Sequence, residues 1–239
     1  MDWVTIYIIA TILILPAFVF GFIAQNLAMS TFEHHAKTVA YKGITGRELA
    51  ENLLAKAGIS DVEVVNINGR MTDCYDPRNK VVKLSNATIN SSSISALGVC
   101  AHEIGHAIQH HRKNIFFKIR QSIVPVVNIF SGMFIPLVFL GSILSFTFAI
   151  ETVGYYIVLV SMITYGLTLL FYFVTLPLEY DASKKAIAML EKENVLSPSE
   201  LEHAKQVLKA AIYTYISSMM TTLLYFLRFL SYAMIFNKD

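Results

Sequence analysis

Residues 102–106 read His-Glu-Ile-Gly-His, and their types and spacing point directly to metal chemistry. Two histidines four positions apart lie one turn apart on the same helix face, so both imidazoles can reach one ion. Glu103 lies beside them, where it can take a proton from a water that zinc has made acidic. The small, apolar residues 96–101 favour a buried site over a surface helix that carries two histidines by chance. The segment therefore predicts Zn²⁺ on His102 and His106, with Glu103 as catalytic base.

A third protein ligand is expected, because a catalytic zinc usually has three and keeps one position open. His110 shares the helix face of the pair, but on a continuous helix it lies about 12 Å from His102, too far for one ion. We expect it near the exposed end of the helix. Glu179 is the better candidate, because it follows an apolar hairpin that would return the chain to the membrane face of the motif. A carboxylate at the edge of a bilayer needs a partner. The alternative partners for it are basic: Lys184, Lys185 and Arg120.

The composition is that of a membrane protein, with 55% hydrophobic and only 15% charged residues. Residues 3–32, 121–150 and 152–178 contain no charged residue, and each stretch is long enough to cross a bilayer as a helix. The first lacks the basic start of a signal peptide, so we expect a retained anchor. Residues 210–236 contain only Arg228 and carry a polar stripe, which favours a fourth span over an interfacial helix. The net charge of +2 gives no indication of nucleic-acid binding.

These patterns predict a mainly α-helical integral membrane protein with about four transmembrane helices. A small α+β, zincin-like catalytic domain is expected between the first and second spans. The expected divisions are an N-terminal anchor (1–28), the metallopeptidase domain (29–120), a transmembrane hairpin (121–178), a cytoplasmic helical segment with the third ligand (179–209) and a C-terminal transmembrane or interfacial helix (210–239).

The polar region after the first span carries signals for both helices and strands. Residues 45–48, Thr-Gly-Arg-Glu, form a capping box, which predicts a helix that ends at Gly58. Residues 62–67 and 80–84 predict two strands. The second of these strands could pair with an extended substrate, as the edges of sheets do in peptide recognition.

The motif helix should run over about residues 94–111, because the serines before it offer N-caps. It is expected to lead, through residues 112–120, into the second span. The third span should end at Pro177, where a new helix begins. Residues 197–200, Ser-Pro-Ser-Glu, form a second capping box that should open the last long helix.

The distribution of basic residues predicts the topology. Twelve of the nineteen Lys and Arg lie between residues 27 and 121, and five more lie between residues 178 and 210. The short connection around Glu151 has none. Because cytoplasmic loops carry an excess of basic residues, both polar segments are predicted to lie in the cytoplasm and the Glu151 turn outside. The motif and Glu179 would then share the cytoplasmic face.

The chain resembles the neutral zinc metallopeptidases of bacterial membranes, the YugP-like family. The resemblance implies zinc on His102, His106 and Glu179, with Glu103 as catalytic acid and base. More distantly, the chain is similar to the membrane gluzincins, such as the CAAX prenyl protease and the HtpX protease. The matching segments are Thr45-Gly46-Arg47-Glu48-Leu49-Ala50, Thr72-Asp73-Cys74-Tyr75-Asp76-Pro77, Leu84-Ser85, residues 101–109, residues 176–183 and residues 210–215.

The chain departs from these relatives at two positions. Related gluzincins usually have an Asp four residues after the ligand Glu, whereas here that position is Ser183 and the acid is Asp181. Asp181 either supports a ligand histidine or is a solvated acid in the first helical turn. Cys74 stands where the family usually has His, and we interpret it as a tolerated loop substitution rather than a metal ligand. With Cys100 it does not form a disulfide framework.

Taken together, the sequence predicts a zinc metallopeptidase of the bacterial plasma membrane, with its active site at the cytoplasmic face. Its expected partners are the lipid bilayer and a membrane-associated polypeptide substrate. A donor such as Tyr75 would stabilise the oxyanion that forms during hydrolysis. Two alternatives stay open: a non-catalytic zinc-binding scaffold, against which the intact Glu103 speaks, and a zinc-dependent membrane hydrolase of non-peptide substrates.

Overall fold

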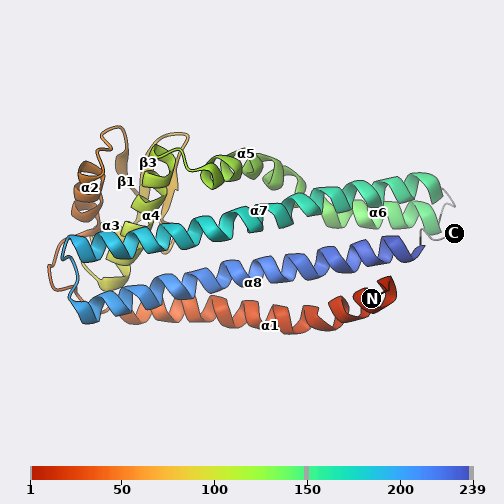
Figure 1. Cartoon of the computed structure of the whole chain (residues 1–239), viewed down its shortest axis with the longest axis horizontal. Coiled ribbons are helices and arrows are strands. Elements are labelled where there is room, and N and C mark those ends of the chain that lie inside the picture. Colours follow the sequence, from red (N-terminus) through yellow and green to blue (C-terminus); the bar gives the residue numbers. More distant parts are fainter. Residues whose placement is uncertain (1, 148–150, 237–239) are drawn as a thin grey trace. The chain divides into compact units, whose positions relative to one another are not determined.

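A computed structural model describes residues 2–147 and 151–236, and helices make up most of it (Figure 1). The described residues form two compact units. The first contains the described parts of Met1–Phe22, Ile119–Thr175 and Tyr215–Asp239, and the second contains Ile23–Lys118 and Leu176–Thr214. The helices are α1 (Trp3–His35), α2 (Gly46–Lys56), α3 (Asn86–Ile89), α4 (Ile94–His111), α5 (Ile115–Phe130), α6 (Phe134–Phe146), α7 (Glu151–Lys192) and α8 (Pro198–Phe236), and the strands are β1 (Glu63–Ile67), β2 (Cys74–Asp76) and β3 (Val81–Ser85).

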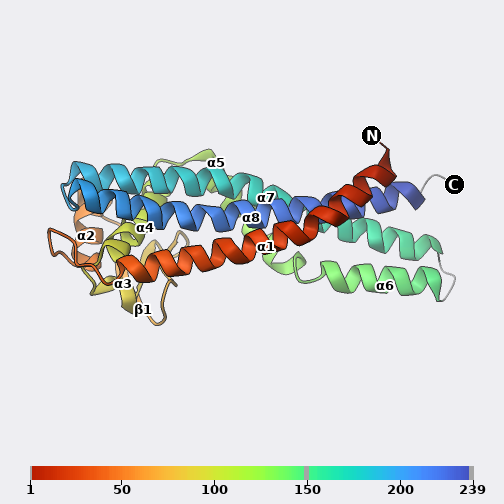
Figure 2. The same cartoon turned by 90° about the horizontal axis from the view of Figure 1, so that it is seen from below.

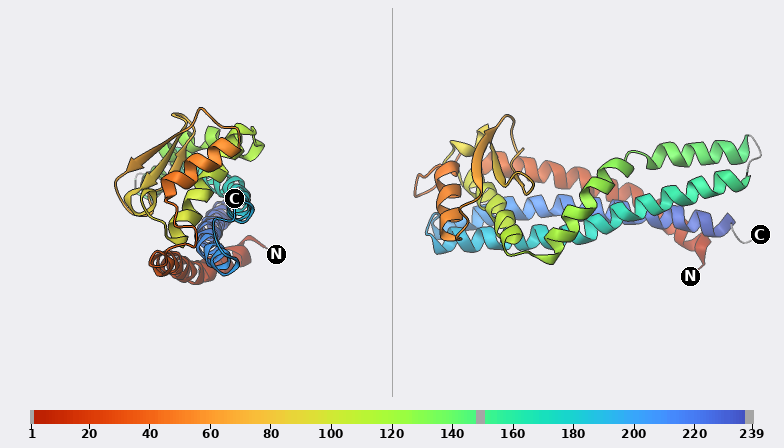
Figure 3. Two further views of the ribbon diagram at one scale, coloured as in Figure 1. Left: turned by 90° about the vertical axis from the view of Figure 1, so that its left-hand side faces the viewer. Right: turned by 90° about the horizontal axis from the view of Figure 1, so that it is seen from above.

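Three helices among the described residues are long and apolar enough to cross a membrane: α1, α7 and α8. The predicted second span is not one helix, because α5 and α6 are separated by a break and bent by 48° (Figure 3, right). Gly132 lies in the break, and glycine is a poor helix former. The pair counts as a fourth span only if both helices are taken together. Of the predicted turn around Glu151, residues 148–150 lie outside the described residues.

The last long helix, α8, begins at the predicted second capping box. Glu200 accepts a hydrogen bond from the Ser197 backbone amide at 2.8 Å. Farther along α8, the guanidinium of Arg228 lies 5.7 Å from the centre of the Tyr7 ring, a cation–π contact with α1. The one charged side chain of this apolar stretch therefore has an aromatic partner inside its own unit.

Helix α7 does not end at Pro177, and this corrects the sequence-based expectation of two helices. It continues without a break from Glu151 to Lys192 (Figures 1 and 2). Proline removes one helical hydrogen bond, but the residues that follow are good helix formers and bury their inner face. Leu178 and Ala182, for example, are fully buried.

The small sheet has the strand order β1-β3-β2. β1 runs parallel to β3, and β2 runs antiparallel to it. The predicted strands at 62–67 and 80–84 correspond to β1 and β3, whereas β2 was not expected. Because β3 lies in the middle of the sheet, the idea that residues 80–84 offer a free edge to a substrate is wrong. The free edges belong to β1 and β2.

The helix that carries the motif has the predicted bounds. Ser93 caps its start by accepting a hydrogen bond from the Ala96 amide at 3.3 Å. The capping box of α2 is also present, with Thr45 and Glu48 bonded reciprocally. A turn at residues 112–114 separates α4 from α5, and Lys113 there has a positive φ of 54°.

Candidate metal centre

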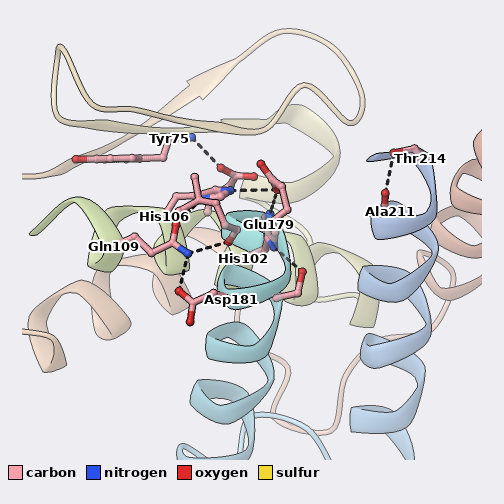
Figure 4. Close-up of polar contacts among 11 residues, drawn as sticks. Tyr75, His102, His106, Gln109, Glu179, Asp181, Ala211 and Thr214 are labelled. Atoms are coloured by element: carbon pink, nitrogen blue, oxygen red, sulfur yellow. Dashed lines mark hydrogen bonds and ion pairs between the residues drawn. The ribbon is translucent and has the colours of Figure 1, made fainter. Parts of the chain in front are cut away.

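His102, His106 and Glu179 lie together on the second unit (Figure 4). Their ligand atoms all fall within 4.8 Å of one another. Oε2 of Glu179 is 3.1 Å from Nε2 of His102 and 3.4 Å from Nε2 of His106. Within residues 2–147 and 151–236, this is the one group of three or more His, Cys, Asp or Glu side chains that could hold a metal ion.

A close approach of two helices brings these side chains together. α4 supplies both histidines, and α7 supplies Glu179. Gly105 lies at the contact, where a Cβ atom would come within 2.8 Å of the backbone oxygen of Ala182. Glycine at the fourth position of the motif therefore allows the two backbones to touch.

The second nitrogen of each histidine also has a partner. Nδ1 of His102 is 3.1 Å from the hydroxyl of Ser183, and Nδ1 of His106 is 2.9 Å from Oε1 of Gln109. Such contacts orient ligand imidazoles and fix the tautomer that binds metal. Sequence reasoning did not find these two residues. The available signal was their spacing, because residues three or four apart on a helix share a face.

The chemistry of the group fits zinc. Two imidazole nitrogens and one carboxylate are the ligand set of thermolysin-type catalytic zinc sites, which keep a fourth position for water or substrate. The side chain of Glu179 is only 2% exposed, and a buried carboxylate needs charged or hydrogen-bonding partners. His110 is not part of the group, in agreement with its distance along the helix.

Glu103 is held by the backbone of β2. Its Oε2 accepts a hydrogen bond of 2.8 Å from the amide N–H of Tyr75 (Figure 4). The side chain of Glu103 is buried beside the two histidines on α4. The unexpected strand β2 thus positions the residue predicted to be the catalytic base.

The hydroxyl of Tyr75 is engaged elsewhere, 2.8 Å from Nδ1 of His110. Phe117 stacks on His110 and also contacts the Tyr75 ring. Burial, together with the negative charges of Asp61 and Asp76, raises the pKa of Tyr75 to about 12. Burial lowers the pKa of His110. Both groups are therefore neutral at pH 7, and an oxyanion role for Tyr75 stays a prediction.

Neither cysteine forms a disulfide. Cys74 is exposed, and partial burial of its sulfur together with the charge of Glu103 raises the pKa of the thiol. Cys100 is buried, and its thiol donates to the backbone oxygen of Gly46 at 3.1 Å. Neither belongs to the metal-binding group.

Comparisons with known proteins agree with this chemistry. Residues 10–234 match the family described as "Putative neutral zinc metallopeptidase". Over 209 residues, the chain is 37% identical to "Putative membrane protease YugP" of Bacillus subtilis (strain 168), an alignment that covers 87% of this chain and 89% of that protein. No solved structure matches the chain. The resemblance seen in the sequence motifs is confirmed, and the chain belongs to the neutral zinc metallopeptidase family.

Proposed function

We propose that this protein is an integral-membrane zinc metallopeptidase that hydrolyses peptide bonds. In this proposal His102, His106 and Glu179 hold the zinc, and Glu103 is the general base and acid. The convergence of these three ligands beside a buried glutamate, in a chain of a zinc metallopeptidase family, is the observation that carries the proposal.

The chemistry divides between the metal and the chain. Zinc bound here would act as a Lewis acid, which acidifies a water molecule and polarises the substrate carbonyl. Glu103 takes a proton from the attacking water and passes it to the leaving nitrogen, as general acid–base catalysis requires. In the structure the N–H of Tyr75 donates to Oε2 of Glu103 and so helps to position this carboxylate.

The edge of β2 is the best candidate for binding the substrate backbone. β2 is an outer strand of the sheet, and its main chain already contacts Glu103. An extended peptide can add to such an edge through main-chain hydrogen bonds, which align a peptide bond without selecting its sequence. This assignment replaces the central strand β3.

The proposed location is the bacterial plasma membrane, with the active site at the cytoplasmic face. Three apolar helices and the membrane protease named among the relatives support a membrane setting. The basic residues of the two polar segments support the cytoplasmic side. Membrane-associated polypeptides would then be the substrates.

The test separates metal binding from catalysis. Glu103→Gln keeps the size and polarity of the side chain but removes the base. Purified protein with this change should retain zinc and lose cleavage of a peptide library by about 10²–10⁴-fold. Glu51→Gln, at an exposed glutamate of α2, is the control and should cleave normally. Unchanged cleavage by Glu103→Gln would contradict the proposal.

A further inference from the structure

Gln109 makes three polar contacts although it is almost completely buried, with 1% of its surface exposed. Its Oε1 lies 2.9 Å from Nδ1 of His106. Its Nε2 lies 2.9 Å from the backbone oxygen of Leu178 and 2.7 Å from Oδ2 of Asp181 (Figure 4). One amide side chain therefore contacts a proposed metal ligand on α4 and two residues of α7.

These contacts fix the orientation of the amide. A backbone carbonyl and a carboxylate can only accept hydrogen bonds, so the group that faces both must be the NH₂ with its two donors. The oxygen of Gln109 must then face His106. Because that oxygen can only accept, Nδ1 of His106 must carry a hydrogen.

We propose that Gln109 is a positioning residue that sets the tautomer of His106 for metal binding. With the hydrogen held on Nδ1, only Nε2 can offer a lone pair, and Nε2 is the atom that faces Glu179. The inference rests on the proposed function only in taking the metal to be zinc. The tautomer itself follows from the contacts of Gln109.

His102 offers a contrast within the same site. Its Nδ1 faces the hydroxyl of Ser183, which can either donate or accept a hydrogen bond. That contact does not select a tautomer. The two ligand histidines therefore differ, because Nδ1 of His106 is held as a donor and Nδ1 of His102 is not.

Gln109 also connects His106 with the segment of α7 that carries Glu179. The two residues of α7 that it contacts, Leu178 and Asp181, lie on either side of Glu179. Asp181 is in turn paired with Lys185. Asp181 therefore reaches His106 only through the side-chain amide of Gln109. Asp181→Ala should weaken the arrangement only partly, because the carbonyl of Leu178 still orients the amide.

Zinc affinity, measured by competition with a chelator, tests the inference. Gln109→Met keeps the length of the side chain and removes all three contacts. It should weaken zinc binding by about 10–100-fold, as loss of a partner behind a ligand histidine usually does. Asp181→Ala should fall between this variant and the wild type.

Gln206→Met is the matched control. Gln206 also presents its Oε1 to a histidine, 3.3 Å from Nε2 of His35, but it does not contact the metal group. Its replacement should leave zinc affinity unchanged. The inference is overturned if Gln109→Met binds zinc as tightly as the wild type, or if both variants weaken binding equally.

A second measurement needs no variant. Long-range ¹⁵N–¹H couplings in histidine-labelled wild-type protein report which ring nitrogen carries the hydrogen. In metal-free protein His106 should carry a hydrogen on Nδ1, whether or not Nε2 carries one toward Glu179. An Nδ1 without a hydrogen would overturn the inference even if Gln109→Met failed to fold. Wild-type protein that binds no zinc would contradict the proposed function, while the tautomer would still decide this inference.

Discussion

The burial of the Glu179 carboxylate shows what partners the site must supply. A carboxylate that is 2% exposed loses its hydration and needs charged or hydrogen-bonded partners. Nε2 of His102 and Nε2 of His106 are the partners in this structure. A zinc ion between the three side chains would satisfy the carboxylate and both nitrogens together. Removing one partner from such a buried group is costly, since it leaves the other charge uncompensated.

Asp76 closes the turn between β2 and β3, and its hydrogen bonds predict how stability depends on pH. Its carboxylate accepts hydrogen bonds from Lys83 at 2.7 Å and from the Asn79 side chain at 2.9 Å, and these hold its pKa below the ordinary value. Because the pKa of Asp76 is lower in the folded state, its ionised carboxylate stabilises the fold at pH values above the unfolded pKa of about 4. This stabilisation is lost as the pH falls through the folded pKa.

Asp76→Ala should therefore cost about 1–3 kcal/mol of unfolding free energy at pH 7. The difference from the wild type should shrink steadily as the pH is lowered below about 4. Denaturant unfolding in detergent across this range measures it. Asp61→Ala is the control, because Asp61 pairs with Lys80 at 2.6 Å on the open surface and should matter little. A pH-independent loss in Asp76→Ala would refute the charge-based explanation.

The members of the candidate site that the sequence predicted have two kinds of signal. His102, Glu103 and His106 follow from their spacing on one helical turn, and Glu179 follows from the order of apolar and polar segments. Gln109 and Ser183 were missed because a glutamine or serine near a motif has many possible roles. Only the packing of α4 on α7 shows that their polar atoms meet the histidines.

At the scale of elements, the site depends on how closely α4 and α7 approach. Glycine at position 105 leaves room for the backbone of Ala182, three residues beyond Glu179. A larger residue would push α7 away and move the third ligand from the histidines.

Gly105→Ala tests this contact. The added methyl group would lie 2.8 Å from a backbone oxygen, so we expect a loss of about 1–3 kcal/mol of stability together with weaker zinc binding. Gly98→Ala, on the same helix, is the control. Its added Cβ would meet Ala204 at an ordinary 3.7 Å, and the better helix propensity should leave stability equal or higher. Thermal melts and chelator competition on both variants decide it. Equal behaviour would rule out the close-approach argument.

The elements that the sequence predicted well have strong local signals, and those it missed do not. The two capping boxes and the motif helix have their predicted starts. β2 has three residues and no alternation long enough to reveal a strand. The continuation of α7 through Pro177 depends on packing of the residues beyond it, which outweighs the local preference to stop. Strand order could not be predicted, because pairing is a tertiary property.

For the whole molecule, the proposed metal centre requires the two polar segments to lie on the same side of the membrane. His102 and Glu179 can share a metal only if both are on one side. The connecting apolar segments must therefore leave and return to the same face. The structure brings the three proposed ligands together, and the distribution of basic residues supports the proposed cytoplasmic side.

Cysteine labelling tests this topology in intact cells after Cys74 and Cys100 are replaced. A cysteine at Thr152 should react with a membrane-impermeant reagent from outside. Cysteines at Asn79 and Asn194 should react only after permeabilisation, because both lie in segments rich in basic residues. Labelling of Asn79 and Asn194 from opposite sides is incompatible with the site. The reverse of the whole pattern would keep the site but place it outside the cell.

Elemental analysis of the purified protein shows whether the proposed metal centre holds zinc. Wild type should contain about one zinc per chain, as a mononuclear site requires. Ala at His102, His106 or Glu179 should each reduce zinc sharply, whereas His110→Ala, on the same helix but outside the metal group, should not. Full zinc occupancy in Glu179→Ala, or zinc loss in His110→Ala that matches the loss in His106→Ala, would contradict the proposed centre.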